Sequence, residues 1–288
     1  MNDCNRPSLS VVSLKAFGDF LIAYRSILAV ERDSLTEGLG VIAGSYIDPL
    51  VKCLEASSSI VKIINEIQFG DVPAAFDVRR KGGMAALRSL CELRCVLKKY
   101  SNNSVLLFDH LGWRERIIGS SAKKIGIAKT WPNIYLGYDN LFLSLGFSLR
   151  KAKVAMNNKS GIGIVVPSSR LERKTLDSNT IKTACGSLSA EGYNTFVLLM
   201  EGDSVVLPRG VQVLKIERSF QALKSVLTTA SVVIAADSFP AHFSDFLDVP
   251  TFVLSRTPNL YWLPKGVYYS HAFSGFNDLG LLTEWLRR

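Results

Sequence analysis

The chain has 288 residues, 48% of them hydrophobic, and a formal net charge of +9 at pH 7. A chain of this length and composition can bury one large core or two medium cores. No apolar run reaches the roughly 20 residues that a membrane-spanning helix needs, and no internal repeat stands out. The N-terminal stretch MNDCNRPS lacks the charged, apolar and small-residue pattern of an export signal, so we expect a protein that is not exported.

The first half of the sequence alternates short apolar runs with amphipathic stretches. The apolar runs predict buried strands, at residues 8–14, 39–44, 58–64, 104–109 and 123–128. Helical spacing of apolar residues, every three or four positions, predicts helices over residues 19–31, 83–100 and 113–122.

After residue 150 the alternation begins again. Apolar runs predict further strands, at residues 160–167, 194–200, 211–216, 231–236 and 250–254. Helices are expected over residues 177–191, over residues 219–230 with Ser219 as N-cap, and over the C-terminal stretch 279–288. Strands with little polar alternation, separated by helices, are typical of a parallel sheet that is covered on both faces.

Two such series predict an α/β fold of two Rossmann-like domains whose parallel sheets face a central cleft. We expect the domains to span residues 1–155 and 156–288, joined near the basic stretch RKAKVAMNNKS (150–160). The last helix is a candidate to pack back on the first domain.

Ligands of open parallel sheets bind beyond the carboxyl ends of the strands, so the loops that follow strands are the candidates for a site. Four such loops carry polar residues: KAFGD (15–19), PSSRLERK (167–174), MEGD (200–203) and ADSFPAH (236–242). Each also has a purely structural interpretation, as a helix cap, a solvated basic loop, a surface turn or a capped helix start.

The first of these loops has two interpretations. Gly18 permits a tight turn, and Asp19 stands at the start of a helix. Its carboxylate is either an N-cap or a general base that faces an acceptor hydroxyl. The loop has no G-x-G-x-x-G pattern, so a dinucleotide cofactor is not indicated.

The loops of the second half suit an anionic ligand. Ser168 and Ser169 offer hydroxyl and backbone N–H groups, and a group of basic residues supplies charge for a diphosphate: Arg170, Arg173 and Lys174. Glu201 directly follows a strand, where a carboxylate can accept hydrogen bonds from a ribose diol, although a surface acid is the common alternative.

The loop at 236–242 resembles a helix start that binds phosphate. Asp237 and Ser238 are expected to cap the next helix, whose free N–H groups attract phosphate, and Pro240 fits its first turn. His242 either adds a hydrogen bond to the phosphate or is a partly buried histidine.

Positive charge is concentrated in residues 1–155, which hold 21 Lys and Arg against 14 Asp and Glu, whereas residues 156–288 hold 13 and 11. This excess suits an anionic partner such as nucleic acid, an acidic glycolipid or a membrane surface, or else simple solvation. No zinc-finger spacing or RNP-like motif favours nucleic acid. The five cysteines contain no C-x-x-C pair, and we expect buried free thiols in a reducing cytoplasm.

Taken together, these loops resemble the heptosyltransferase family, glycosyltransferase family 9. The resemblance is carried by the Gly-Asp turn after the first strand, the Pro-Ser-Ser…Arg-Lys loop of residues 167–174 and the Asp-Ser-x-Pro-x-His loop of residues 237–242. Residues 106–128 and 248–264 are similar to the middle and late segments of that family. The resemblance spans nearly the whole chain and implies the two-domain architecture called GT-B.

The resemblance also implies roles for individual residues. Asp19 would be the catalytic base. The nucleotide-sugar donor would be held by residues of the second domain, namely Ser168, Ser169, Arg173, Lys174, Glu201, Asp237, Ser238, Phe239 and His242. The basic first domain would face an acidic acceptor, with Lys15, Arg79, Arg80, Arg114 and Arg116 as the candidate contacts. No cofactor is implied, and no metal, since the chain has no Asp-x-Asp motif.

The implied activity is a metal-independent, inverting transfer of a sugar, heptose from ADP-heptose, to a lipopolysaccharide core or a related surface glycan. Two alternatives stand beside it: a GT-B enzyme that uses another nucleotide sugar in O-antigen or capsule assembly, and a catalytically inactive, transferase-like binding protein. The implied partners are an ADP-sugar donor and an anionic glycolipid or oligosaccharide acceptor, without nucleic acid. The implied location is the cytoplasm, peripherally at the cytoplasmic face of the inner membrane.

Overall fold

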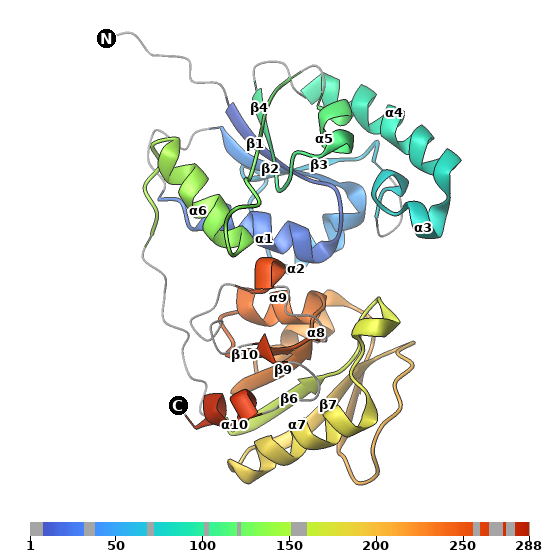
Figure 1. The fold of residues 1–288 in the computed structure, drawn as a ribbon, viewed down its shortest axis with the longest axis vertical. Helices are drawn as coiled ribbons and strands as arrows, with labels where there is room; N and C mark the ends of the chain where they lie inside the picture. The colour runs from blue at the N-terminus through green and yellow to red at the C-terminus, as the bar shows by residue number, and fades with distance from the viewer. Residues whose placement is uncertain are drawn as a thin grey trace. The chain divides into compact units, whose positions relative to one another are not determined.

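The structure, a computed structural model, divides into two compact units, Met1–Ala152 and Lys153–Arg288, and each is described here by itself (Figure 1). It describes residues 8–31, 38–67, 72–100, 104–119, 122–150, 160–255, 260–264, 273–274 and 280–287. The expected domain boundary after residue 155 and nearly all of the expected linker lie in residues 151–159, outside the described residues.

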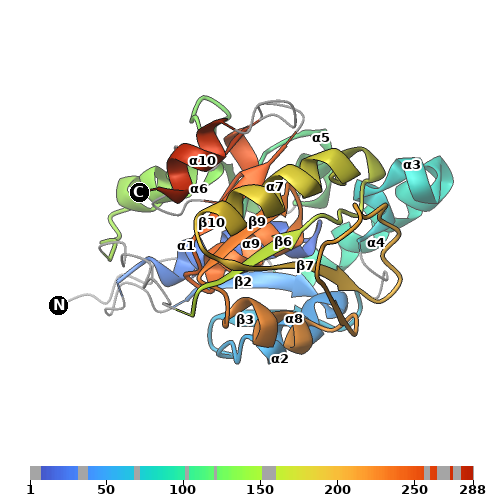
Figure 2. The same ribbon diagram turned by 90° about the horizontal axis from the view of Figure 1, so that it is seen from below.

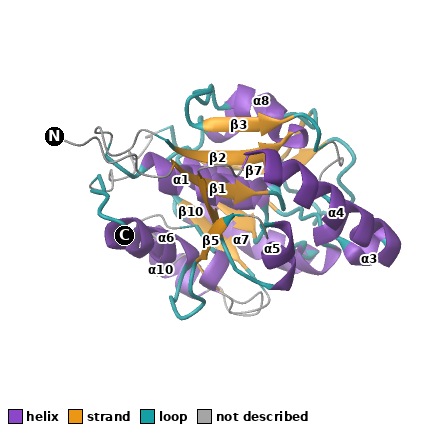
Figure 3. Cartoon of the chain, turned by 90° about the horizontal axis from the view of Figure 1, so that it is seen from above, coloured by secondary structure: helices purple, strands orange, loops and turns teal. Residues whose placement is uncertain are grey.

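The first unit holds a five-stranded sheet in which all neighbours are parallel. Its strands are β1 (Ser8–Ser13), β2 (Leu39–Gly44), β3 (Val61–Ile64), β4 (Ser104–Phe108) and β5 (Lys123–Gly126). Their spatial order is β3-β2-β1-β4-β5, and Figure 3 shows β1, β2 and β3 as neighbouring strands. The order of strand addition therefore reverses at β1, and such a topological switch point is where open α/β sheets bind ligands.

Helices and short 3-10 turns follow these strands. The helices are α1 (Phe17–Leu28), α2 (Asp48–Cys53), α3 (Val78–Lys81), α4 (Gly83–Tyr100), α5 (Trp113–Ile118) and α6 (Ile134–Ser144). The 3-10 turns are Ser45–Ile47 and Ala74–Phe76. One core of the unit joins strand residues to α4 and α5, through Val12, Ile42, Ile64, Leu106, Phe108, Leu90, Leu93, Leu97 and Ile118.

The second unit repeats this topology in a six-stranded parallel sheet. Its strands are β6 (Ile162–Val166), β7 (Asn194–Met200), β8 (Val213–Ile216), β9 (Val232–Ala236), β10 (Thr251–Leu254) and β11 (Phe273–Ser274). The order β8-β7-β6-β9-β10-β11 again places the first strand between the second and the fourth. The switch point of this sheet lies between β6 and β9.

Helices cover both faces of the second sheet, as its apolar strands require. They are α7 (Ser178–Ala190), α8 (Phe220–Leu227), α9 (Phe239–Phe246) and α10 (Gly280–Leu286), with 3-10 turns at Glu172–Lys174 and Leu260–Trp262. Figure 2 shows α7 running along β6 and β7, and α9 packs on β9 and β10. Val232, Ile234 and Ala236 share a core with α7 and α10, while the alternate residues Val233 and Ala235 are also fully buried.

The final helix packs within its own unit. Leu282 and Trp285 of α10 belong to the core of the second sheet, and the Trp285 ring lies 5.3 Å from the ring of Phe252. The hydrophobic side of α10 therefore contributes to the core of the second unit.

Most elements lie where the sequence predicts them. The predictions for 39–44, 83–100 and 194–200 match β2, α4 and β7 residue for residue. Others differ at their ends. The helix predicted over 19–31 is α1, which begins at Phe17 and ends at Leu28. The strand predicted from residue 58 begins at Val61, because Ile60 N–H donates to the Ser57 carbonyl in a turn, at 2.9 Å. The helices α2, α3 and α6 were not predicted.

The expectation of buried thiols is half correct. Cys53 and Cys185 are buried, but Cys91 and Cys95 are exposed. Cys91 and Cys95 share one face of α4, because they are four residues apart. This face is exposed to solvent, away from the buried Leu90, Leu93 and Leu97. Within the described residues, no helix has both the length and the apolar character of a membrane span.

Candidate functional site

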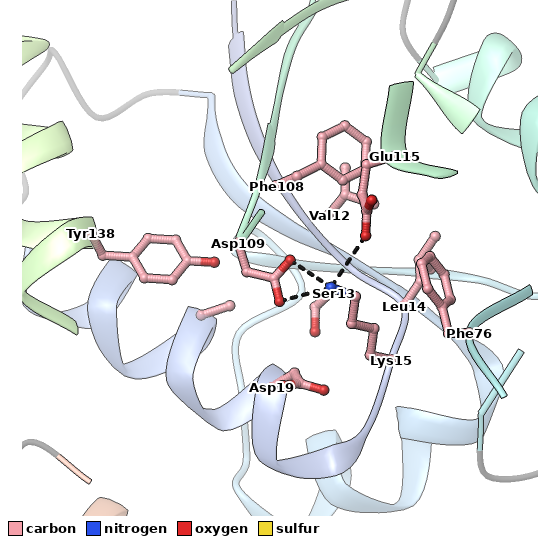
Figure 4. A pocket seen from close by; sticks show the side chains of 11 residues that line it. Val12, Ser13, Leu14, Lys15, Asp19, Phe76, Phe108, Asp109, Glu115 and Tyr138 are labelled. Carbon is pink, nitrogen blue, oxygen red and sulfur yellow. Dashed lines mark hydrogen bonds and ion pairs between the residues drawn. The ribbon is translucent and has the colours of Figure 1, made fainter. Parts of the chain in front are cut away.

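A pocket in the first unit lies at the carboxyl ends of β1 and β4, at the switch point (Figure 4). Its polar lining comes from four elements: Ser13 and Lys15 at the end of β1, Asp19 on α1, Asp109 and Glu115 after β4, and Tyr138 on α6. Leu14, Phe76 and Phe108 supply apolar walls. The pocket is thus apolar at its sides and carries one cation and three carboxylates.

Lys15 is held between two of these carboxylates. Its Nζ donates to Oδ1 and Oδ2 of Asp109 at 3.0 and 3.1 Å, and lies 3.2 Å from Oε1 of Glu115. Burial lowers the pKa of Lys15, but the carboxylates of Asp109, Glu115 and Asp19 together outweigh burial and raise the pKa above its ordinary value. Lys15 therefore stays protonated, with its charge already paired inside the unit.

Two of the pocket carboxylates belong to helix starts. Asp19 is the third residue of α1, and its Oδ2 accepts a hydrogen bond from the backbone N–H of Ala16 at 2.9 Å. Glu115 is the third residue of α5, and its Oε2 accepts from the N–H of Gly112 at 3.1 Å. Each satisfies a backbone donor that the helix leaves unpaired, which holds the carboxylate in place.

A structural role at the helix start and a position in the pocket are compatible for Asp19. The N-cap position belongs to Ala16, so the expectation that Asp19 is itself the N-cap is wrong. The residue supports the start of α1 from the third position and also lines the pocket, as Figure 4 shows.

The four arginines predicted to bind an acceptor do not line this pocket. Arg79 and Arg80 are exposed on α3, and Arg116 is exposed on α5. The guanidinium carbon of Arg114 lies 5.1 Å from the centre of the Trp113 ring. Of the predicted acceptor residues, the structure brings only Lys15 together with Asp19.

A second cluster lies at the switch point of the second sheet, where the loops after β6 and β9 are linked. Lys174 Nζ donates to Asp237 Oδ2 at 2.7 Å. Ser238 Oγ lies 3.2 Å from both the Ser168 and the Ala236 carbonyl oxygens, to which it can donate. The structure thus brings Ser168, Lys174, Asp237 and Ser238 together.

The Ser168 hydroxyl is the unusual group of this cluster. Ser168 is buried, and its Oγ has no hydrogen-bond partner among the described residues. The neighbouring Ser169 N–H donates to Thr175 Oγ1 at 3.2 Å, so that backbone donor is already used within the loop. Buried hydroxyls are normally paired, and an unpaired one at a strand end is available to a ligand.

His242 lies one turn into α9 and is buried. Burial lowers the pKa of His242 to about 4, with Asp237 raising it and Lys174 lowering it further. The imidazole is therefore neutral at neutral pH, and it can offer a hydrogen bond but no positive charge.

The start of α9 differs in one respect from the prediction. Ser238 occupies the N-cap position but makes no side-chain capping bond, and Asp237 is paired with Lys174 instead. The prediction that these two side chains cap the helix is therefore wrong. Pro240 lies in the first turn, as predicted.

The remaining predicted donor residues lie apart from these contacts. Arg173 and Glu201 are exposed. The ring of Phe239 packs between those of Phe220 and Phe243, at centroid distances of 5.4 and 5.2 Å. Phe239 is thus an anchor between α8 and α9.

The same ion pair occurs in both units. In each sheet a lysine from the loop after the first strand pairs with the aspartate that directly follows the fourth strand: Lys15 with Asp109, and Lys174 with Asp237. Each pair joins the two loops that meet at the switch point of its own sheet. Across the described part of the chain, no three His, Cys, Asp or Glu residues gather as a metal site would require.

Sequence reasoning missed four polar residues of the first pocket: Ser13, Asp109, Glu115 and Tyr138. Asp109 follows a strand directly, so the rule applied to the other strand-end loops would have found it. Glu115 has a weaker signal, an acid three residues after Gly112 at a helix start. Tyr138 lies on α6, which was not predicted; the available signals were Asn133 as an N-cap and the three- and four-residue spacing of Tyr135, Tyr138 and Phe142.

Comparison with known proteins gives no match to any family model and none to the curated protein sequences. Solved structures of similar fold are found over nearly the whole chain. They include E. coli heptosyltransferase WaaC with ADP-2-deoxy-2-fluoro heptose (13% identity, TM-score 0.59, 97% of this chain and 98% of that one). E. coli ADP-heptose lps heptosyltransferase II is 12% identical, with a TM-score of 0.56 and coverage of 97% of each chain.

A third similar structure is the glycosyl transferase family 9 protein from Veillonella parvula DSM 2008. It is 12% identical, with a TM-score of 0.60, over 98% of this chain and 89% of that one. Identities this low establish the fold alone. The predicted fold class, two α/β units of the GT-B type, is confirmed.

Proposed function

We propose that the chain is a metal-independent, inverting glycosyltransferase that moves heptose from ADP-heptose to a lipopolysaccharide core or a related surface glycan. The first unit would bind the acceptor, and the second the nucleotide sugar. The observation that carries the proposal is the position of Asp19, a carboxylate held by a backbone N–H in a pocket at the switch point of a parallel sheet.

Asp19 would act as the general base. As the acceptor hydroxyl oxygen attacks the anomeric carbon, a new C–O bond forms and the bond from that carbon to the diphosphate oxygen breaks. The hydroxyl proton passes to the Asp19 carboxylate, and the electron pair leaves with the nucleoside diphosphate. Attack opposite the leaving group inverts the anomeric centre. Lys15, paired with Asp109 and Glu115, would keep a positive charge close to Asp19.

The cluster in the second unit would hold the diphosphate. Lys174 supplies charge, and the unpaired Ser168 hydroxyl supplies a hydrogen bond. The first-turn N–H groups of α9 would add donors directed at the ligand. Growing negative charge on the leaving diphosphate would be stabilised there. Ser169, Arg173 and Glu201 would complete the donor site through their loops, with Glu201 on the ribose, and Phe239 would contribute only by anchoring α9 against α8.

The nucleotide is proposed by analogy with similar folds. The WaaC structures were solved with ADP and with ADP-2-deoxy-2-fluoro heptose. For the acceptor, an anionic glycolipid or oligosaccharide suits the basic first unit, whose expected contacts are the arginines at 79, 80, 114 and 116. Such an acceptor places the protein in the cytoplasm, at the inner-membrane face.

Two measurements test the proposal. The first is a thermal-shift screen with ADP, UDP, GDP, CDP and CMP, in which we expect ADP to raise the melting temperature, because a ligand that binds the folded state stabilises it. If another nucleotide raises the melting temperature and ADP does not, the donor is a different nucleotide sugar. No shift with any of the five at millimolar concentration would refute the donor site.

The second measurement is turnover of ADP-heptose by Asp19→Asn. Loss of the base should lower kcat by about 10²–10⁴-fold while ADP still shifts the melting temperature. Asp48→Asn is the matched control, because Asp48 also lies in the first turn of a helix but outside the pocket. If the wild type binds ADP but turns over no more sugar than Asp19→Asn, the protein is an inactive transferase-like binding protein.

A further inference from the structure

The segment Val78–Tyr100, which contains α3 and α4, presents an apolar stripe to solvent. Met84 is 81% exposed and Leu87 is 56% exposed. Cys91 and Cys95 are exposed as well. These four residues recur every three or four positions of α4, so they lie along one face of the helix.

This stripe is not explained by the core. The core-facing side of α4 is formed by Leu90, Leu93 and Leu97, which are all buried. A helix that only covers a sheet needs one apolar side and a polar one. On α4 the exposed Met84 and Leu87 lie outside this core-facing side, interspersed with basic residues, and exposed apolar side chains that gather on a protein surface generally mark an interaction site.

Positive charge surrounds the stripe. Residues 78–100 contain seven basic residues and one acid: Arg79, Arg80, Lys81, Arg88, Arg94, Lys98 and Lys99 against Glu92. The net charge of these 23 residues is therefore +6, out of +9 for the whole chain. Their acid is already paired, since Arg88 Nε donates to Glu92 Oε1 at 2.8 Å.

The neighbouring helix α5, which packs against α4, carries the same combination. Trp113 is 61% exposed, and the cationic group of Arg114 stands 5.1 Å from its ring. Figure 1 shows α3, α4 and α5 at one end of the first sheet. Tryptophan and arginine side chains together are favoured where an apolar phase meets a charged aqueous one.

We propose that the exposed side of α4, together with α3, binds the surface of an anionic lipid bilayer. Met84 and Leu87 enter the headgroup region, and the surrounding Lys and Arg side chains contact lipid phosphates. A helix with an apolar stripe, basic flanks and too little apolar length to cross the bilayer is typical of a segment that lies in the interface.

Two other partners fit less well. The phosphates of a nucleic acid would pair with the basic side chains, but nucleic acid binding would not explain the exposed Met84 and Leu87. A second copy of the chain, paired through the same face, would bring two strongly basic segments together, which is repulsive even though Arg80 and Lys99 face Asp77 and Glu66. A bilayer with acidic headgroups complements both the charge and the apolar stripe.

The inference deepens the proposed function, because it names the surface that would bring the enzyme to a lipid-borne acceptor. Its test does not depend on catalysis. Full-length protein is sedimented with vesicles of phosphatidylcholine alone, or of phosphatidylcholine mixed with phosphatidylglycerol, at low and high salt. We expect binding to the anionic vesicles at low salt, weakened by high salt, and little binding to the neutral ones.

Variants assign the binding to α4. Met84→Ser with Leu87→Ser should lower the vesicle partition coefficient about tenfold, and Arg94→Gln with Lys98→Gln should lower it on anionic vesicles only. The matched controls lie in the second unit: Val206→Ser, at a residue that is 77% exposed, and Lys182→Gln with Arg209→Gln, at exposed basic residues. The controls should leave partition within about twofold of the wild type. Circular dichroism and the ADP thermal shift establish that each variant is folded.

Native thiols give a second readout. In a Cys4→Ser background, maleimide labelling of Cys91 and Cys95 should slow when anionic vesicles are added. The proposal is overturned if neutral and anionic vesicles bind equally, if neither binds, or if the Met84 and Leu87 changes leave binding intact. It is also overturned if a DNA oligonucleotide, rather than vesicles, protects the thiols. Vesicle binding with no ADP shift would refute the proposed function alone, and the reverse result would refute the membrane surface alone.

Discussion

Lys15 Nζ lies 3.0 Å from Oδ1 of Asp109, a residue 94 positions further along the chain, and joins the loops that follow β1 and β4. Replacing Lys15 with Met should leave Asp109 and the buried Glu115 as neighbouring carboxylates without a cation. We expect the free energy of unfolding, measured with urea, to fall by about 2 kcal/mol, somewhat less than for a fully buried pair.

An exposed ion pair provides the control for that experiment. Arg88 and Glu92 lie one turn apart on the surface of α4, and Arg88→Met should cost about 0.5 kcal/mol or less. Adding Glu115→Gln to Lys15→Met should recover part of the loss, because it removes one of the two unpaired charges. Equal losses for Lys15→Met and Arg88→Met would contradict the prediction.

The Ser168 hydroxyl has no partner among the described residues, so we expect its removal to weaken ADP binding without lowering the stability of the fold. Ser168→Ala removes a buried polar atom that has no partner among the described residues, so the free energy of unfolding should stay within about 1 kcal/mol of the wild type or rise. Affinity for ADP, measured by calorimetry, should fall about fivefold as one hydrogen bond is lost. Ser89→Ala, at another buried and unpaired hydroxyl on α4, should leave ADP affinity unchanged.

The buried His242 predicts a loss of stability in acid. Burial lowers its pKa from 6.5 to about 4, so between these pH values the unfolded chain binds more protons than the folded one. The free energy of unfolding must therefore fall as the pH drops through this window, by about 2 kcal/mol on going to about pH 5. Urea unfolding at about pH 7 and about pH 5 measures this change.

His242→Gln should make that pH dependence smaller by the amount due to one histidine. Ser244→Ala, at a buried residue of the same helix that does not titrate, is the control and should keep the wild-type dependence. Identical slopes for wild type and His242→Gln would show that His242 titrates normally in the folded protein.

Phe239 tests whether a residue predicted to lie in the donor site is instead a packing anchor. Phe239→Ala would remove a half-buried ring that packs against Phe220 and Phe243, at a cost of about 2 kcal/mol in the free energy of unfolding. ADP affinity of the folded variant should stay within about twofold of the wild type. A tighter or weaker affinity beyond that range would assign the ring to the site itself.

The sheets could be predicted from the sequence because their strands are almost continuously apolar. All five residues of β9 are buried, so its sequence is a run of Val, Ile and Ala, which is typical of a parallel strand that is covered on both faces. The missed helix α6 shows the limit of this reasoning. Its buried Tyr135, Tyr138 and Phe142 do follow helical spacing, but Leu136, Leu141 and Leu143 are apolar too, so the stretch lacks the polar side that marks an amphipathic helix.

The candidate sites depended on strand order, which local sequence does not contain. The pocket and the Lys174–Asp237 pair both lie at strand-end loops, yet which two loops meet is decided by the reversal at β1 and at β6. This reversal places Lys15 against Asp109, whereas Arg79 and Arg116, predicted with Lys15 as acceptor contacts, do not line that pocket. The same reversal in the second sheet explains why Asp237, which was expected to cap a helix, pairs with Lys174 instead.

The repeated lysine–aspartate pair bears on how either site would admit an anion. A phosphate that reaches Lys174 does not meet a bare cation, because Asp237 already occupies it at 2.7 Å. A phosphate that binds there replaces the Asp237 carboxylate as the partner of Lys174. The free energy gained is therefore the difference between the lysine–phosphate pair and the lysine–aspartate pair. Such a site responds less steeply to salt than an unpaired lysine would, and it prefers ligands whose charge and shape surpass those of a carboxylate, as a diphosphate does.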